Sequence, residues 1–151
     1  MPITSLVVRD AVATDRLTLQ QIFLSGRRQL DTQGMLTLDQ FDEQTRGERV
    51  LIAEETPAAP VGFVSVYMAD HFIHHLYVAP GHQRRGVGLA LLHALPGWQR
   101  VRYQLKCLSL NTSALTFYTS CGFLPIASGS SANGEYLLLE SRGASYAQDR
   151  V

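Results

Sequence analysis

The sequence predicts a single domain of the α/β (α+β) class, in which a mixed, mostly antiparallel sheet of six to seven strands carries about four helices. Seven short segments are rich in β-branched and aromatic residues, and four segments repeat apolar residues with helical spacing. One of these helices separates two strands in the middle of the chain, where a right-handed crossover would make the strands parallel. The 151 residues fit one domain, 1–151, and 141–151 are expected to form a loose tail.

The first predicted strand and helix lie in the N-terminal part of the chain. The β-branched run at 5–11 ends at a polar turn and predicts a strand. Apolar residues then recur at helical spacing as far as Leu30, and Thr14 or Asp15 is available as the N-cap. A first helix is therefore expected to begin near Thr14.

A short second helix and three strands follow. Thr37 is followed three residues later by Gln40, a capping-box pattern that predicts a helix ending near Thr45. The next segments are rich in β-forming residues and are separated by turn residues. The three predicted strands span 49–55, 61–70 and 71–80.

The second half of the chain alternates helices and strands before two closing strands. Apolar residues from Val87 to Leu95 form one helical stripe, which Pro96 and Gly97 end. Gly122 is suited to end the last helix because glycine adopts the left-handed backbone conformation easily. The other predicted elements are a strand at 103–110, a helix at 111–122, and strands at 123–128 and 135–140 around a loop.

Composition and charge narrow the functional classes. Lys plus Arg and Asp plus Glu both number 13, so the net charge is zero and we expect no nucleic-acid partner. The chain has no run of about 18 apolar residues and no signal-peptide pattern, which predicts a cytoplasmic protein without a membrane partner. Cys107 and Cys121 lie in apolar patterns without metal-ligand spacing, so we expect reduced core thiols and no metal site.

The segment GHQRRGVG at 81–88 places two arginines beside a glycine-rich turn and a predicted helix. A mononucleotide loop is excluded because Val87 and Gly88 stand where a lysine and a serine or threonine would be needed. A dinucleotide fingerprint is excluded because Leu91 replaces its third glycine. The turn and the helix N-terminus still suit a pyrophosphate. The two arginines either bind a further phosphate or are solvated residues at the helix start.

Two segments resemble the GNAT superfamily of N-acetyltransferases. The superfamily's acetyl-CoA-binding motif is Gln or Arg, two residues, Gly, one residue, then Gly or Ala, and 83–88 fits it completely. The segment NTSALTFYTSCGF at 111–123 is similar to the second signature of the superfamily, and the element order matches from Ser5 to Glu140. The resemblance implies a splayed parallel pair at the fourth and fifth strands. It also implies transfer of an acetyl group from acetyl-CoA to an amine by direct attack in a ternary complex.

By this resemblance, acetyl-CoA is the cosubstrate and several groups would bind it. Main-chain groups of the fourth strand would bond the pantetheine arm much as an added strand would, and the glycine-rich turn would bind the pyrophosphate. Asn111 would bond the pantetheine, although it also fits a plain helix N-cap. The implied set is Leu76, Tyr77, Val78, Gln83, Arg84, Arg85, Gly86, Val87, Gly88 and Asn111.

Acetyl transfer to an amine also requires proton transfers. The resemblance implies Tyr118 as the group that assists the leaving thiolate, while the alternative is that Tyr118 only packs on the buried face of its helix. The amine needs a base because an alkyl ammonium, with a pKa near 10, is mostly protonated at pH 7. His74 and His75 should point to opposite faces of a strand, so at most one faces the cleft. We assign His74 as the base, with His75 or a water relay as alternatives.

The sequence says less about the acceptor, which the resemblance implies to be a small-molecule or peptide amine. Lys106 stands where ribosomal-protein N-terminal acetyltransferases of the superfamily carry a glutamate base, which argues against that specialisation. The acceptor is expected to contact 27–46 and the loop near 128–134. Four acidic residues either attract a cationic amine or form a solvated helix face: Asp31, Asp39, Asp42 and Glu43.

Two other functions compete with acetyl transfer. An acyl-CoA-binding or sensor module on the same fold would bind without turnover, and the presence of Tyr118 argues against it. A toxin that acetylates aminoacyl-tRNA is disfavoured by the zero net charge. A homodimer could form through the apolar final strand at 135–140, if that strand is an edge of the sheet.

Overall fold

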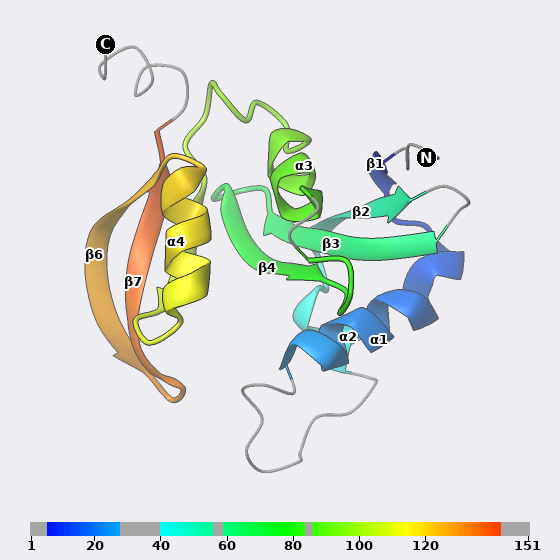
Figure 1. Cartoon of the computed structure of the whole chain (residues 1–151), viewed down its shortest axis with the longest axis horizontal. Helices are drawn as coiled ribbons and strands as arrows, with labels where there is room; N and C mark the ends of the chain where they lie inside the picture. Colours follow the sequence, from blue (N-terminus) through cyan, green and yellow to red (C-terminus); the bar gives the residue numbers. More distant parts are fainter. Residues whose placement is uncertain (1–5, 28–39, 56–58, 84–85, 143–151) are drawn as a thin grey trace.

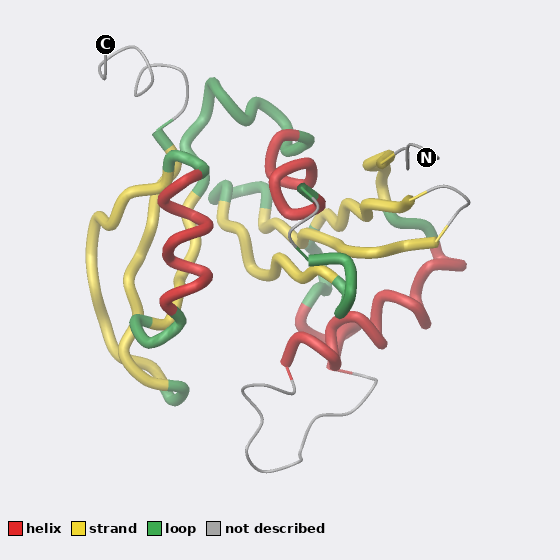
Figure 2. Tube along the Cα trace, in the orientation of Figure 1, coloured by secondary structure: helices red, strands yellow, loops and turns green. Residues whose placement is uncertain are grey.

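The computed structural model describes residues 6–27, 40–55, 59–83 and 86–142. Seven strands and four α-helices are present in this part of the chain, as Figures 1 and 2 show, and they confirm the predicted mixed α/β class. The strands are β1 (Leu6–Asp10), β2 (Arg49–Glu55), β3 (Ala59–Tyr67), β4 (Phe72–Val78), β5 (Gln104–Leu108), β6 (Phe123–Ser131) and β7 (Gly134–Ser141). The helices are α1 (Arg16–Arg27), α2 (Gln40–Gln44), α3 (Val87–His93) and α4 (Thr112–Ser120).

All seven strands belong to one sheet with the order β1-β2-β3-β4-β5-β7-β6. Every neighbouring pair is antiparallel except β4 and β5, which are parallel. That parallel pair has a single register position, Phe72 opposite Gln104, so the two strands diverge beyond it. The predicted splay is therefore present. Figure 1 shows β6, β7 and α4 on one side of the molecule and β1, β2, β3 and α1 on the other.

The helices cover the two faces of the sheet and create two cores. Side chains of α3 and α4 pack with Val64, Leu105 and Cys107 in the larger core, on what we call the cofactor face. Side chains of α1 and α2 pack with Ile52 and Phe63 in the smaller core, on what we call the acceptor face. Because β-strand side chains alternate between faces, the central strands β2, β3 and β4 contribute to both cores. No described helix has the length and apolar character that crossing a membrane would require.

The first helix begins differently from the expectation. A short 3₁₀ turn at Ala13–Asp15 precedes α1, and Asp15 caps it from within because its carboxylate accepts a hydrogen bond from the Val12 backbone N–H at 2.8 Å. The same carboxylate pairs with Arg9 at 2.9 Å, and this bond lowers the pKa of Asp15 despite its burial. The predicted positions Leu30 and Thr37 lie outside the described residues.

The closing strands are longer than predicted and lie in a different order. The expected loop at 129–134 is mostly strand, since β6 continues to Ser131 and β7 begins at Gly134. Gly129 permits this pairing because a Cβ there would lie 2.5 Å from the Tyr136 hydroxyl oxygen. β7 lies between β5 and β6, so the segment 135–140, a candidate edge in the sequence, is inside the sheet. A closing strand that inserts beside β5 leaves β6 as the edge, and backbone pairing of β7 is complete on both sides.

Candidate active site

The glycine-rich turn after β4 requires two of its glycines for their backbone conformation. Gly81 and Gly86 have φ values of +87° and +83°, in the left-handed region that strains other residues. Apart from the chain neighbours, no atom of the described residues lies within 4 Å of a Cβ built on either residue, so conformation and not space selects glycine there. Gly88 differs, because its Cβ would lie 3.0 Å from Cζ of Phe117 and would push α3 away from α4. Arg84 and Arg85 lie outside the described residues.

The free side of β4 follows from the splay. Leu76, Tyr77 and Val78 pair with β3 on one side, whereas the register with β5 ends at Phe72. Backbone N–H and C=O groups that point toward β5 at these positions have no described strand to bond. Unpaired strand groups bind an extended, amide-bearing chain well. The gap between β4 and β5 therefore suits the predicted pantetheine arm.

Tyr118 lies on α4 among apolar side chains of the larger core. Its ring packs edge-on against Phe117 and Phe123, with ring centroids 5.2 and 5.4 Å away. Burial raises the pKa of the Tyr118 hydroxyl well above its usual range, and the nearby Cys107 and Tyr77 raise it further. The hydroxyl thus keeps its proton at physiological pH and can donate a hydrogen bond.

The two adjacent histidines of β4 do not point to opposite faces as predicted. Ser65 of β3 pairs with His75, but the next residue, Val66, pairs with Ile73, so His74 is an extra residue in a β-bulge. The bulge interrupts the alternation of side chains. As a result the His74 and His75 rings stack with their centroids 3.9 Å apart.

His75 is fixed inside the smaller core. It is buried, and its Nδ1 lies 2.8 Å from the Ser65 hydroxyl while its Nε2 lies 3.1 Å from Oε1 of Gln44. The Gln44 oxygen only accepts, so Nε2 carries a hydrogen and Nδ1 accepts from Ser65. Its ring also packs edge-on against Phe23. With both nitrogens occupied, His75 serves the structure of this face.

His74 has a different environment, because only one of its nitrogens bonds to a described residue. Its side chain is 39% exposed, and its Nδ1 lies 2.8 Å from Oε2 of Glu48. A carboxylate accepts this bond, which places the hydrogen on Nδ1 and the lone pair on Nε2. The other oxygen of Glu48, Oε1, is buried and has no hydrogen-bond partner in the described part of the chain. The pair has the arrangement of a carboxylate-oriented imidazole base.

Glu48 is a site residue that the sequence analysis missed. It lies 26 residues before His74 and belongs to the segment between α2 and β2, so no local spacing connects the two. Ligand atoms of Glu48, His74 and His75 lie within 4.8 Å of one another, which brings together residue types that hold metal ions where no metal site was predicted. Since both His75 nitrogens already have protein partners, we interpret the group as a hydrogen-bond network.

Asn111 forms the N-cap of α4, the alternative that the sequence left open. Its Oδ1 accepts hydrogen bonds from the Ala114 backbone N–H at 3.2 Å and from the Ser113 hydroxyl at 3.4 Å. The side-chain NH₂ group takes no part in this cap and can still donate a hydrogen bond to a ligand. Asn111 therefore has a structural function in addition to any contact with pantetheine.

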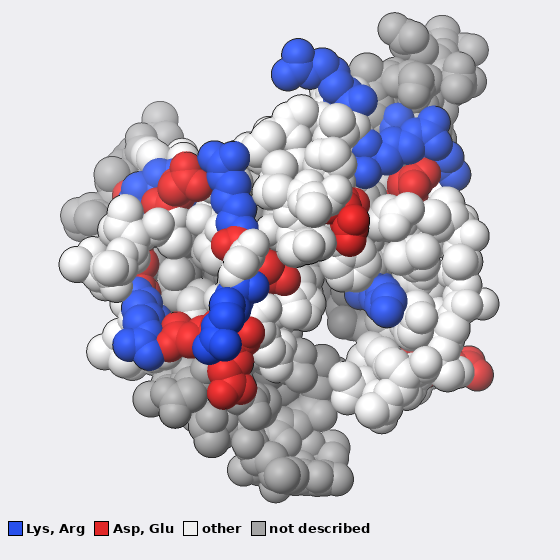
Figure 3. Space-filling model, turned by 180° about the vertical axis from the view of Figure 1, so that it is seen from behind, with Lys and Arg blue, Asp and Glu red and all other residues white. Residues whose placement is uncertain are grey.

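The acidic residues expected near the acceptor are partly neutralised. Asp42 pairs with Arg16 and accepts a bond from Gln20, and the Arg16 bond lowers the pKa of Asp42. Asp31 and Asp39 lie outside the described residues. Figure 3, seen from behind relative to Figure 1, shows Lys or Arg and Asp or Glu side chains next to one another over one half of the molecule. Charge on this surface is mixed, so it does not form a general cation-binding face.

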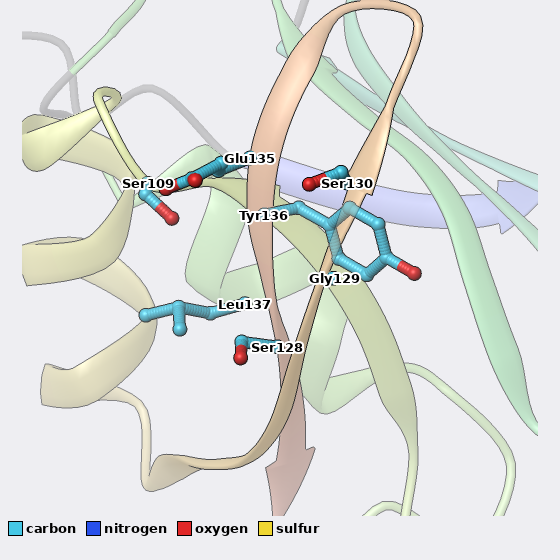
Figure 4. A pocket seen from close by; sticks show the side chains of 7 residues that line it. All are labelled: Ser109, Ser128, Gly129, Ser130, Glu135, Tyr136 and Leu137. Carbon is cyan, nitrogen blue, oxygen red and sulfur yellow. The ribbon is translucent and has the colours of Figure 1, made fainter.

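A hollow lies beside the β6–β7 hairpin. It has a volume of about 290 Å³ and includes part of the predicted 128–134 region. Figure 4 shows Leu137 directed toward α4, whereas the Tyr136 ring lies on the other side of β7, next to Gly129. The lining residues are Ser109, Ser128, Gly129, Ser130, Glu135, Tyr136 and Leu137. None of them belongs to the predicted catalytic or cofactor-binding set.

Comparisons with known proteins agree with this geometry. No curated protein sequence matches the chain. A structure of a spermidine N-acetyltransferase mutant from Vibrio cholerae is similar, with 14% identity, a TM-score of 0.69, and coverage of 97% of this chain and 98% of that one. The ribosomal-protein-S18-alanine N-acetyltransferase from Escherichia coli gives 17% identity, a TM-score of 0.68, and coverage of 91% and 93%.

A third similar structure was solved with acetyl-CoA. It is the yncA protein of Salmonella typhimurium with its cofactor acetyl-CoA, at 19% identity, a TM-score of 0.65, and coverage of 92% of this chain and 95% of that one. These low identities support the fold alone. The family model of the GNAT acetyltransferase domain, however, matches residues 46–125, which is more than half of the chain. The chain therefore belongs to the GNAT family of acetyltransferases.

Proposed function

We propose that this protein transfers the acetyl group of acetyl-CoA to the primary amine of a small molecule or peptide by direct attack in a ternary complex. The observation that carries the proposal is the pair of opposed proton-handling groups at the β4–β5 gap. Tyr118 belongs to the cofactor face, and the Glu48–His74 pair belongs to the acceptor face. A gap with a phenol that keeps its proton on one side and an imidazole held by a carboxylate on the other suits acyl transfer to an amine.

The residues that would hold acetyl-CoA surround the same gap. Backbone groups of 76–78 would bond the pantetheine amides, and the turn at 83–88, including Arg84 and Arg85, would bind the pyrophosphate. Gly86 supports this role through its left-handed conformation, which no side chain crowds. Asn111 would use its NH₂ group, since its oxygen caps α4. The bound molecule supplies the acetyl thioester.

His74 would act as the base for the acceptor. Glu48 holds the imidazole with its hydrogen on Nδ1, which leaves the Nε2 lone pair able to take a proton from the amine. Only about one alkyl amine in a thousand is neutral at pH 7, so this step determines how much acceptor is reactive. The half-buried position of His74 lets the proton pass on to solvent. Glu48 is a positioning residue in this scheme.

Tyr118 would assist departure of the thiolate. Because burial keeps its pKa high, the phenol donates a hydrogen bond to the developing negative charge on sulfur and does not lose its proton beforehand. The amine proton would pass to His74 as the amine nitrogen bonds to the acetyl carbon. The carbon–sulfur bond would then break, with the thiolate sulfur next to Tyr118. Acid and base therefore act from opposite faces of the sheet.

Thiol release from acetyl-CoA across a panel of amines, amino acids and short peptides tests the proposal. We expect amine-dependent release that falls about 100-fold or more in Tyr118→Phe. Tyr67→Phe is the matched control because Tyr67 is 46% exposed and lies outside the gap. If acetyl-CoA binds but no acceptor raises release above hydrolysis, the sensor module replaces the transferase as the function.

A further inference from the structure

Lys106 is the chain's only lysine and lies in the middle of β5. Its neighbours Leu105 and Cys107 are buried in the larger core, which faces α3 and α4. Lys106 is exposed, and the alternation of strand side chains places it on the opposite, acceptor face. This is the face on which the His74 and His75 rings stack.

The strand register places Lys106 across the gap from His74. Phe72 and Gln104 form the single parallel pair, and both His74 and Lys106 are two residues beyond it on their strands. The strands separate from this point, so the two residues stand at the same level on the two strands that border the gap. The Lys106 ammonium lies over Tyr136 of β7, on the other side of β5 from β4, and its long side chain would turn toward β4 to meet a molecule whose amine reaches His74.

The ammonium group of Lys106 is held in place without being neutralised. Its Nζ lies 4.9 Å from the centre of the Tyr136 ring, a cation–π contact. Among the described residues, no carboxylate forms an ion pair with it, in contrast to five of the described arginines. Those five arginines, each paired with a carboxylate, are Arg9, Arg16, Arg49, Arg102 and Arg142. Lys106 thus presents a full positive charge to a ligand on this face.

The acetyl-CoA pyrophosphate does not account for this charge. The glycine-rich turn follows the end of β4 at Val78, four strand residues after His74, and strand residues advance about 3.3 Å each, so the turn begins at least about 13 Å from His74 along the strand. The turn also leads directly into α3 on the other face of the sheet. The group that Lys106 serves must therefore be on the acceptor.

We propose that Lys106 binds an anionic group of the acceptor, so that the preferred substrates are amines that also carry a carboxylate or a phosphate. The inference rests on the proposed acetyltransferase function and specifies its substrate class. The amine is placed at His74 and the anion at Lys106, across the opening of the gap. A polyamine brings only positive charges to this position, and Lys106 repels it.

Matched acceptors separate the anion from the amine. Alanine is compared with alaninamide, and phosphoethanolamine with ethanolamine, while spermidine represents the polycationic class. For each acceptor, kcat/KM is measured by thiol release in the wild type, Lys106→Met, Lys106→Glu and Arg100→Met. Arg100 is the control because it is exposed in the turn between α3 and β5, outside the gap.

We expect the wild type to favour the anionic member of at least one pair, and the better pair identifies carboxylate or phosphate as the anion. Lys106→Met should reduce kcat/KM for that acceptor about tenfold or more while changing its neutral partner less than about twofold. Lys106→Glu should favour spermidine, and Arg100→Met should resemble the wild type.

Three results would overturn the inference. In the first, the neutral and anionic acceptors of each pair have equal kcat/KM, or Lys106→Met lowers kcat/KM equally for both. Either outcome would rule out the anion site without affecting the proposed transferase function. Acetylation of Lys106 itself, seen as one added acetyl group in the intact mass of the wild type but not of Lys106→Met, would make the lysine an acceptor and not an anchor. No amine-dependent release at all would remove the transferase function, and the inference with it.

Discussion

The two faces of the sheet treat their titratable groups in opposite ways at the β4–β5 gap. On the cofactor face, Tyr118 packs among aromatic rings and burial raises its pKa. On the acceptor face, His74 bonds to Glu48 and stacks on His75, which bonds in turn to Ser65. Tyr118 is thus surrounded mainly by apolar and aromatic side chains, whereas His74 belongs to a series of polar side chains in contact with one another.

This difference shows how one fold can give two titratable side chains opposite surroundings. Apolar surroundings penalise the charged phenolate, so Tyr118 keeps its proton. A carboxylate partner selects one imidazole tautomer, so His74 keeps a lone pair on Nε2. Burial keeps the hydrogen on the Tyr118 oxygen, Glu48 holds a hydrogen on Nδ1 of His74, and the sheet between them keeps the two environments separate.

The largest expected effect comes from removing the base on the acceptor face. His74→Ala should lower kcat about 100-fold, because general base catalysis contributes that much or more. The free energy of unfolding should change little, since the side chain is 39% exposed. Steady-state kinetics beside urea unfolding measures both quantities, with the exposed His93→Ala as control. An unchanged kcat would assign proton removal to a water relay.

The neighbouring histidine should show the reverse behaviour. His75→Ala should lower the free energy of unfolding by about 2–3 kcal/mol, because it leaves a cavity and removes a hydrogen-bond partner from Ser65 and Gln44. Urea unfolding measures the loss, and Ser65→Ala, which removes one bond only, should cost about 1 kcal/mol. A stable but inactive His75→Ala protein would mean that His75, and not only His74, takes part in proton transfer.

The free energy of unfolding at alkaline pH should report on the burial of Tyr118 on the cofactor face. Its pKa is raised in the folded state, so above the ordinary tyrosine value of 10.0 the unfolded chain loses a proton that the folded protein retains. The resulting stability is fully present below pH 10 and is lost as pH rises further, by about 1 kcal/mol per pH unit. Urea unfolding between pH 9 and about 11 should show a steeper decline in the wild type than in Tyr118→Phe. Parallel declines would contradict the burial of this hydroxyl.

The smallest effect is expected at Asn111, which joins the cap of α4 to the proposed pantetheine contact. Asn111→Ala should lower the free energy of unfolding by about 1 kcal/mol, the usual value of an N-cap. Asn111→Ser retains a capping oxygen but not the amide NH₂, so it should keep the stability and still weaken acetyl-CoA binding several-fold. Calorimetric titration with acetyl-CoA checks the second effect. Unchanged binding in Asn111→Ser would leave the residue as a cap alone.

Local patterns predicted much of the sheet. The strand expected at 49–55 coincides with β2, and the helix after the glycine-rich turn begins at Val87 as expected. Both depend on short-range signals, namely a β-branched run between turn residues and a glycine before an apolar stripe. The same kind of signal misplaced the end of β6, because Gly129 looked like a turn residue but accommodates the Tyr136 ring.

Relations between distant segments could not be predicted in this way. Alternation placed His74 and His75 on opposite faces, but pairing with β3 introduces the bulge that stacks them. Glu48 carries no motif, and only the position of its segment beside β4 brings it to His74. The sequence left open whether the final strand is an edge, and only its pairing with both β5 and β6 puts it inside the sheet.

The sequence alone determined the order of the elements, the glycine-rich turn with its left-handed positions, and the identity of the chemistry-bearing residues. These properties reside in contiguous residues, whose backbone preferences act over a few positions. Tertiary structure alone decided which face each of these residues occupies and which partner it bonds. That decision depends on strand register, on the bulge at His74 and on the splay after Phe72, all of which arise when segments far apart in the chain pair with one another.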